Sequence, residues 1–128
     1  MFLVRHAEAK AGEPDELRSL TSHGRWQAHD LGKRFARKGI SVDAIVSSPL
    51  VRARETAEGM AAVLGTAAEA DDRLAPGATT EDLRAAVAGR GETVVVVGHQ
   101  PDCGQIAAEL SGGPALSYPT AGVRELDV

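Results

Sequence analysis

The sequence predicts an α/β fold, a three-layer α/β/α sandwich around a mostly parallel sheet. Short apolar runs typical of buried strands alternate along the chain with longer segments of helical periodicity. Most of these runs are continuous rather than alternating, as expected where helices cover both faces of a sheet. No repeat, linker or low-complexity segment interrupts the pattern, so we expect residues 1–128 to form one domain.

The first predicted strand and helix are separated by a long polar loop. Residues 2–5 are an apolar run that ends in a cation and predict a short buried strand. Residues 7–19 are polar and mixed, and they predict a loop long enough to be functional. Thr21 is a candidate N-cap for the helix that follows, and Gly39 stands where a C-terminal glycine is expected.

A second strand and helix are predicted next. Residues 42–46 form the strand, and Ser48 as N-cap with Pro49 at the first helical position favours a helix start there. The apolar face of this helix continues to about Leu64. Residues 67–71 are a candidate for a further short strand.

The second half of the chain continues the alternation. Thr80 is expected to cap a short helix over residues 81–88. Residues 93–97 contain four consecutive valines and give the clearest buried strand of the sequence. A helix is expected over residues 101–110, and residues 122–128 alternate as an edge strand would.

Basic side chains follow three of the predicted strands where each strand ends. Arg5 and His6 follow the first strand, Arg52 lies in the first turn of the helix after the second, and His99 follows the valine strand. A lone histidine there is more often structural, and a lone arginine is usually a solvated charge. Because the carboxyl ends of parallel strands share one edge, the joint occurrence predicts that the four side chains meet there.

Two guanidinium groups, two imidazoles and nearby helix N-termini describe a site for a phosphoryl group. A guanidinium can donate two parallel hydrogen bonds to phosphoryl oxygens, and helix N-termini attract anions. The same cations disfavour imidazolium, so they lower the pKa of an adjacent histidine and leave a lone pair for nucleophilic attack. The spacing alone leaves open whether His6 or His99 attacks.

Composition excludes several classes of protein. The net charge of −4 and the 3% of aromatic residues give no sign of a nucleic-acid or anionic-membrane partner. One cysteine allows no internal disulfide, and no apolar run approaches the roughly 20 residues of a membrane span. The apolar run before Arg5 is too short for a signal peptide. We therefore expect a cytoplasmic protein.

No cofactor and no metal site are expected from the sequence. His6, His99 and Glu8 are the residues that could hold a metal ion near the predicted edge. Arg5 and Arg52 would repel a cation there, so the donor set favours an anion instead.

At these residues the chain resembles the histidine phosphatase superfamily, whose fold is shared with cofactor-dependent phosphoglycerate mutases. That family's first motif is a strand ending in Arg-His-Gly or Arg-His-Ala, and residues 3–8 match it. Its second motif, Ser-Pro-x-x-Arg-x-x-x-Thr-Ala, is present at residues 48–57. Its third, a hydrophobic strand ending in Gly-His or Ser-His, is present at residues 94–99. Each motif is weak alone, but three in the right order are specific.

The length of the chain narrows the resemblance. Larger members insert a helical subdomain around the site, and this chain has no room for one. It is similar to the short SixA-type branch of phosphohistidine phosphatases. Residues 18–24 resemble the Arg-Pro-Leu-Thr…Gly stretch of that branch, with Ser19 in place of the usual proline, and residues 99–102 resemble its His-x-Pro turn.

The resemblance implies a role for each matching residue. Carried over by position, His6 would be the nucleophile that becomes transiently phosphorylated. Arg5, Arg52 and His99 would hold the phosphoryl oxygens, and Arg18 would reach in from the loop as a further phosphate contact. The resemblance thereby chooses between the two histidines.

The general acid and the substrate are less constrained. Glu8 is the candidate acid and Asp72 a weaker one, and either residue could be a solvated loop charge. Phosphohistidine releases imidazole, whose pKa is near neutrality, so it needs less help from an acid than an ester does. We therefore expect the substrate to be a phosphohistidine-bearing protein. Separately, we expect the chain to act as a monomer. The alternatives are a small phosphate ester as substrate and a non-catalytic phosphate-binding or interaction domain.

Overall fold

The computed structural model describes all 128 residues and has a five-stranded central sheet. Its strand order is β3-β2-β4-β1-β5, in which β1 to β4 run parallel and β5 pairs antiparallel with β1. The mostly parallel sheet is therefore confirmed, and the final strand lies at an edge as predicted. The strands are β1 Phe2–Arg5, β2 Ala44–Ser47, β3 Ala68–Ala70, β4 Val94–Gly98 and β5 Val123–Glu125.

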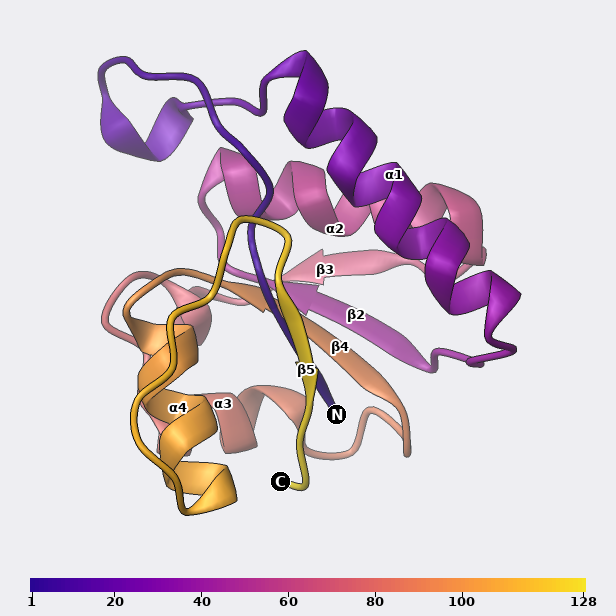
Figure 1. Cartoon of the computed structure of the whole chain (residues 1–128), viewed down its shortest axis with the longest axis vertical. Helices are drawn as coiled ribbons and strands as arrows, with labels where there is room; N and C mark the ends of the chain where they lie inside the picture. The colour runs from indigo at the N-terminus through magenta and orange to yellow at the C-terminus, as the bar shows by residue number, and fades with distance from the viewer.

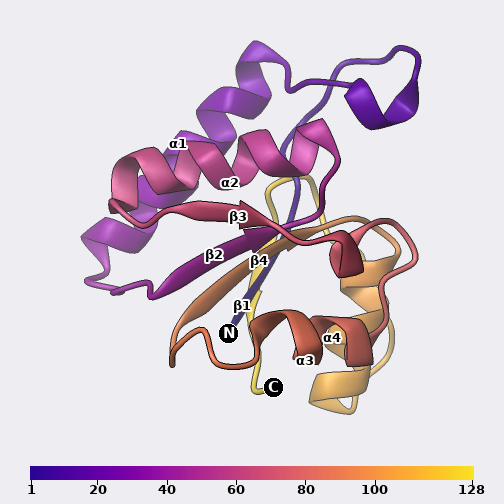
Figure 2. The same cartoon turned by 180° about the vertical axis from the view of Figure 1, so that it is seen from behind.

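Helices cover both faces of the sheet and complete the three layers (Figure 1). The first two helices lie together on one face and the last two on the other, which the reverse view also shows (Figure 2). No additional subdomain extends from the sandwich. None of its helices is both long and apolar enough to cross a membrane. The helices are α1 Ser22–Arg37, α2 Val51–Leu64, α3 Thr80–Val87 and α4 Asp102–Ser111.

The valine strand shows why a continuous apolar run predicted a buried strand. Val94 and Val96 pack in the core on the side of α3 and α4, whereas Val95 and Val97 pack in the core under α1 and α2. All four are at most 3% exposed. Successive side chains of a strand point to opposite faces, so a strand covered on both sides needs apolar residues throughout.

Two predicted helix starts are wrong. Helix α2 begins at Val51 rather than at Pro49, because the Ser48 hydroxyl accepts from the Leu50 amide in a turn before the helix. Helix α3 is capped by Thr79, whose side chain and that of Asp82 form a reciprocal capping box. Thr80 is instead buried and donates to the carboxylate of Glu109 from α4.

Two short 3₁₀ helices were not predicted from the sequence. They span Asp15–Leu17 and Asp72–Leu74, and each is too short to produce a hydrophobic period. Strand β5 covers three residues and not the whole of 122–128, although Leu126 beyond it still exchanges two backbone hydrogen bonds with Met1. These differences leave the order of the elements unchanged.

The long loop after β1 is fastened to the start of α1. The amide of Thr21 donates to the carbonyl oxygen of Glu8 over 3.0 Å, and that of Lys10 donates to Ser19 over 2.9 Å. Gly24 allows this contact, because a Cβ there would lie 2.0 Å from the Glu8 carbonyl oxygen. Thr21 caps α1 as predicted by accepting from the Gly24 amide. The loop that follows His6 therefore has a defined path.

Replacing Gly24 with alanine is expected to destabilise the protein. Alanine is the better helix former, but its Cβ would collide with backbone, so the free energy of unfolding should fall by roughly 1–3 kcal/mol. The matched control is Gly113→Ala, whose Cβ would meet only the Ser111 hydroxyl at 3.8 Å. Urea denaturation of both variants makes the comparison. Equal stability of the two variants would contradict the close approach of α1 and the loop.

Candidate active site

A cavity of about 380 Å³ lies where the carboxyl ends of the parallel strands meet. The strand ends are joined there by backbone hydrogen bonds, from His6 to Gly98 and from Ser48 to Val97, each 3.0 Å long. All residues predicted for the site line this cavity. The lining consists of Arg5, His6, Glu8, Ala9, Asp15, Arg18, Arg52, Pro76, His99, Gln100 and Thr120.

The ring of His6 is held in one tautomer. Its Nδ1 lies 2.8 Å from the carbonyl oxygen of Ala7. A carbonyl oxygen can only accept, so Nδ1 carries the proton and the lone pair of the neutral ring is on Nε2. The residue is 8% exposed, which keeps the ring in place beside the cavity. The geometry therefore provides a neutral imidazole whose Nε2 can act as a base or a nucleophile.

Burial keeps His6 neutral. Its pKa falls from 6.5 to about 4, chiefly because the buried ring loses the hydration of its charged form. The hydrogen bond to Ala7 opposes this shift, and the nearby charges of Arg52, Arg5 and Arg18 add to it. The cations thus act in the predicted direction, but burial is the larger cause.

His99 faces His6 across the site. The two ring centroids are 5.3 Å apart, and Nε2 of His99 lies 2.7 Å from the Ser48 hydroxyl. His99 is 4% exposed, and its pKa is lowered to about 3, chiefly by burial and then by the positive charge that His6 would carry if protonated. Ser48 is therefore a partner of the second histidine, which explains why it is not the cap of α2.

Two arginines present unpaired nitrogens at the cavity. Arg52 donates from Nη1 and Nη2 to Asp15, and Arg5 donates from Nη1 to the carbonyl oxygen of Tyr118 over 2.9 Å. The Nε atoms of both arginines, and Nδ1 of His99, are buried without a hydrogen-bond partner. Because a buried unpaired donor costs free energy, the two Nε–H groups would gain a partner from the oxygens of an anion that enters the cavity.

Arg18 reaches the cavity from the loop, as predicted. Its Nη1 donates to the carbonyl oxygen of Lys10 over 3.2 Å, and its Nε lies 3.0 Å from the carboxylate of Asp15. Its side chain is 26% exposed, so it forms part of the rim of the cavity. The loop thus adds a third guanidinium to the cavity.

Thr56, the threonine of the second motif, connects the backbone that follows His6 with that of Arg52 through two hydrogen bonds. The Thr56 hydroxyl accepts from the Ala7 amide over 2.9 Å and donates to the Arg52 carbonyl oxygen over 2.8 Å. Thr56 and Ala7 are both fully buried. This bridge fixes Ala7, whose own carbonyl holds the ring of His6. The spacing from Arg52 to Thr56 is one helical turn, which brings both to the same side of α2.

Of the two candidate acids, the structure brings only Glu8 to the cavity. The side chain of Glu8 is 48% exposed, and its carboxylate lies 4.0 Å from Nε2 of His23. The backbone amide of Glu8 donates to the side-chain oxygen of Gln27. Asp72 lies in the second 3₁₀ helix and is not part of the lining. No group of three His, Cys, Asp or Glu side chains is arranged to hold a metal ion.

Five lining residues were not anticipated from the sequence, namely Ala9, Asp15, Pro76, Gln100 and Thr120. Asp15 contacts two of the arginines, and Gln100 and Thr120 complete the wall. Gln100 lies between His99 and Pro101, which match the His-x-Pro turn of the resemblance. Asp15 lies in the loop judged long enough to be functional, but nothing in its neighbourhood indicates which side chain it would contact.

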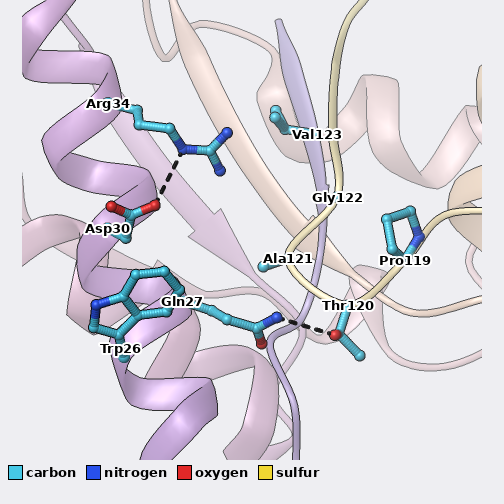
Figure 3. A pocket seen from close by; sticks show the side chains of 9 residues that line it. All are labelled: Trp26, Gln27, Asp30, Arg34, Pro119, Thr120, Ala121, Gly122 and Val123. Carbon is cyan, nitrogen blue, oxygen red and sulfur yellow. Dashed lines mark hydrogen bonds and ion pairs between the residues drawn. The ribbon is translucent and has the colours of Figure 1, made fainter.

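A second cavity of about 370 Å³ lies between α1 and residues 119–123 (Figure 3). The Gln27 amide donates to the Thr120 hydroxyl over 3.3 Å, and Thr120 lines both cavities. The guanidinium in this second cavity belongs to Arg34, and it is paired with Asp30 at 3.4 Å. No histidine lines it. Phosphoryl chemistry therefore fits the first cavity and not the second.

Comparison with known proteins agrees with this geometry. The model of the histidine phosphatase superfamily (branch 1) matches residues 1–76. An uncharacterized protein of Picosynechococcus sp. is 37% identical over 134 residues, which cover 96% of this chain and 81% of that protein. The solved structure of the protein histidine phosphatase SixA complexed with tungstate has a TM-score of 0.83 and 25% identity. That match covers 94% of this chain and 82% of the other.

A further relative matches only part of the chain. The mitochondrial serine/threonine-protein phosphatase Pgam5 of Drosophila mojavensis is 48% identical over 59 residues. The match covers 45% of this chain and 20% of that protein. The matched stretch is therefore only about a fifth of the length of this relative.

The pKa of His6 gives a direct test of the site. Because the pKa is lowered, the ring should stay neutral as the pH falls through 6 and 5 and should take up a proton only near pH 4. NMR titration of the imidazole nitrogens of the native protein measures this value. In urea the same ring should titrate near its ordinary value of about 6.5. A native pKa near 6.5 would show that the ring is not buried as described.

Proposed function

The chain belongs to the histidine phosphatase superfamily. From this premise we propose that residues 1–128 are one domain of that family, which hydrolyses phosphoryl groups through a phosphohistidine intermediate on His6. The observation that carries the proposal is the free Nε2 lone pair of His6 beside a cavity lined by three guanidinium groups. A non-catalytic anion-binding domain would need the arginines but not a histidine held in this tautomer.

The arginines would bind and orient the phosphoryl group. Arg5 and Arg52 each keep a buried Nε without a partner, and Arg18 lies at the rim. Guanidinium groups donate charge-assisted hydrogen bonds to phosphoryl oxygens and stabilise the charge that spreads over them in the transition state. His99, across from His6, would hold a further oxygen. Catalysis would then come mainly from positioning and electrostatics.

The reaction would proceed in two displacements at phosphorus. First, the Nε2 lone pair of His6 forms the N–P bond while the bond from phosphorus to the leaving group breaks, and the leaving group takes up a proton. Second, a water oxygen attacks phosphorus, the N–P bond breaks, and the electron pair returns to Nε2. The water gives up a proton, so the products are inorganic phosphate and neutral His6.

Glu8 is the proposed proton donor for the leaving group. It lines the cavity two residues after His6, and its carboxylate is half exposed and able to exchange protons with solvent. A substrate that releases imidazole would depend on this donor less than an ester would, because imidazole is the better leaving group.

Phosphohistidine in a protein is the proposed substrate. The similar solved structure is that of a protein histidine phosphatase, and no inserted subdomain restricts access to the cavity. Ala9 is the one hydrophobic residue in its lining, so the wall offers little to the organic part of a small ester. A small phosphate ester is the alternative substrate. We further propose that the protein is a cytoplasmic monomer, consistent with its single cysteine and its charge.

The proposal is tested by incubating the protein with a phosphohistidine-bearing domain and, separately, with a panel of phosphate esters. We expect turnover of the phosphohistidine protein and an acid-labile, alkali-stable phosphoenzyme. Both should be lost in His6→Ala, with activity lower by at least about a thousandfold. The matched control is His29→Ala, which removes an exposed histidine outside the cavity and should leave activity unchanged.

Each other outcome removes a part of the proposal. Preference for an ester would reject the phosphohistidine substrate and keep the nucleophile. A phosphoenzyme that persists in His6→Ala would reject the nucleophile. Absence of turnover with either class would leave the non-catalytic binding domain.

A further inference from the structure

One residue that lines the proposed catalytic cavity, Asp15, carries a carboxylate that contacts the arginines of the cavity. One carboxylate oxygen of Asp15 lies 3.0 Å from Nε of Arg18, and the other lies 3.1 Å from Nη2 of Arg52. The carbonyl oxygen of Asp15 accepts a further hydrogen bond from Nη1 of Arg52 over 2.8 Å. Asp15 therefore binds both terminal nitrogens of Arg52, which is the arrangement that a phosphoryl group would use.

Asp15 is charged where it lies. The hydrogen bond from Arg52 is the largest cause that holds the pKa of this carboxyl group below its usual range, and Arg18 adds to the effect. An ionised carboxylate beside two of the three guanidinium groups cancels part of the field that attracts a phosphate dianion. It would also repel that dianion directly.

The contact is weak enough to be displaced. The 3₁₀ helix Asp15–Leu17 has no buried residue, and Leu17 is 62% exposed. The Asp15 side chain is 61% exposed, although its partner Arg52 is 7% exposed. Because Asp15 can move from the contact into water, a phosphoryl group that also reaches Arg5 and His99 can take over the nitrogens of the buried Arg52.

We infer that Asp15 is a specificity-determining residue, an internal competitor of the phosphoryl group that weakens the binding of free inorganic phosphate. The identity of this product rests on the proposed function. A phosphoprotein gains further contacts from its polypeptide and tolerates the competition, whereas free phosphate has only its oxygens. Asp15 thus favours release of the product over its retention.

The chain offers a matched control next to Asp15. Glu16 lies on the same 3₁₀ helix, is exposed, makes no ion pair or side-chain hydrogen bond, and does not line the cavity. Asp15→Asn and Glu16→Gln each remove one negative charge from this helix. Only the first removes it from a contact with Arg52, and the asparagine keeps an oxygen that can still accept from Nη2.

The experiment measures the dissociation constant of inorganic phosphate by isothermal titration calorimetry at low ionic strength. We expect Asp15→Asn to bind phosphate roughly three- to tenfold more tightly than the wild type, and Glu16→Gln to change less than about twofold. Asp15→Ala should show the same gain. A thermal melt of each variant checks that it is folded.

Damage to the site would weaken the binding of phosphate. A gain in affinity for phosphate therefore cannot be explained by damage, and the result decides the question in either direction. Phosphate bound equally or more weakly by Asp15→Asn would overturn the inference, because Asp15 would then serve to hold Arg52 in place. An equal gain in Glu16→Gln would also overturn it, since a general charge effect would explain both. The measurement needs no turnover, so the inference about Asp15 can stand or fall separately from the proposed reaction.

Discussion

The hydrogen bond from Nδ1 of His6 to the carbonyl oxygen of Ala7 is the interaction on which the site depends. It fixes the tautomer, and with it the nitrogen that presents a lone pair. Ala7 can serve in this way because its amide is held by Thr56, and Thr56 in turn donates to the Arg52 carbonyl oxygen. The proposed nucleophile, His6, and Arg52 are thus linked by one continuous set of buried hydrogen bonds, from the end of β1 to α2.

Much of this arrangement could be predicted from the sequence because it follows from topology. Four valines in a row require a strand covered on both faces, and alternation with helices requires a parallel sheet. A parallel sheet brings the ends of β1, β2 and β4 to one edge, so Arg5, His6 and His99 had to lie near one another. These conclusions need no knowledge of side-chain conformation.

The features that were missed depend on individual contacts. Ser48 and Thr80 have strong local preferences as caps, but the Ser48 hydroxyl pairs with His99 and with the Leu50 amide before α2, and the Thr80 hydroxyl donates to Glu109. Asp15 reaches Arg52 across 37 positions through a loop without periodicity, so no pattern could assign the pair. The tautomer of His6 likewise depends on one 2.8 Å contact that only coordinates reveal.

We propose that the fold, through Ala7, selects Nε2 of His6 as the atom that takes the phosphoryl group. The most direct measurement is NMR of the trapped phosphoenzyme, in which coupling between phosphorus and the ring nitrogens identifies the phosphorylated atom. We expect phosphorus on Nε2 of His6, with Nδ1 still protonated. Phosphorus on Nδ1 of His6, or on His99, would contradict it.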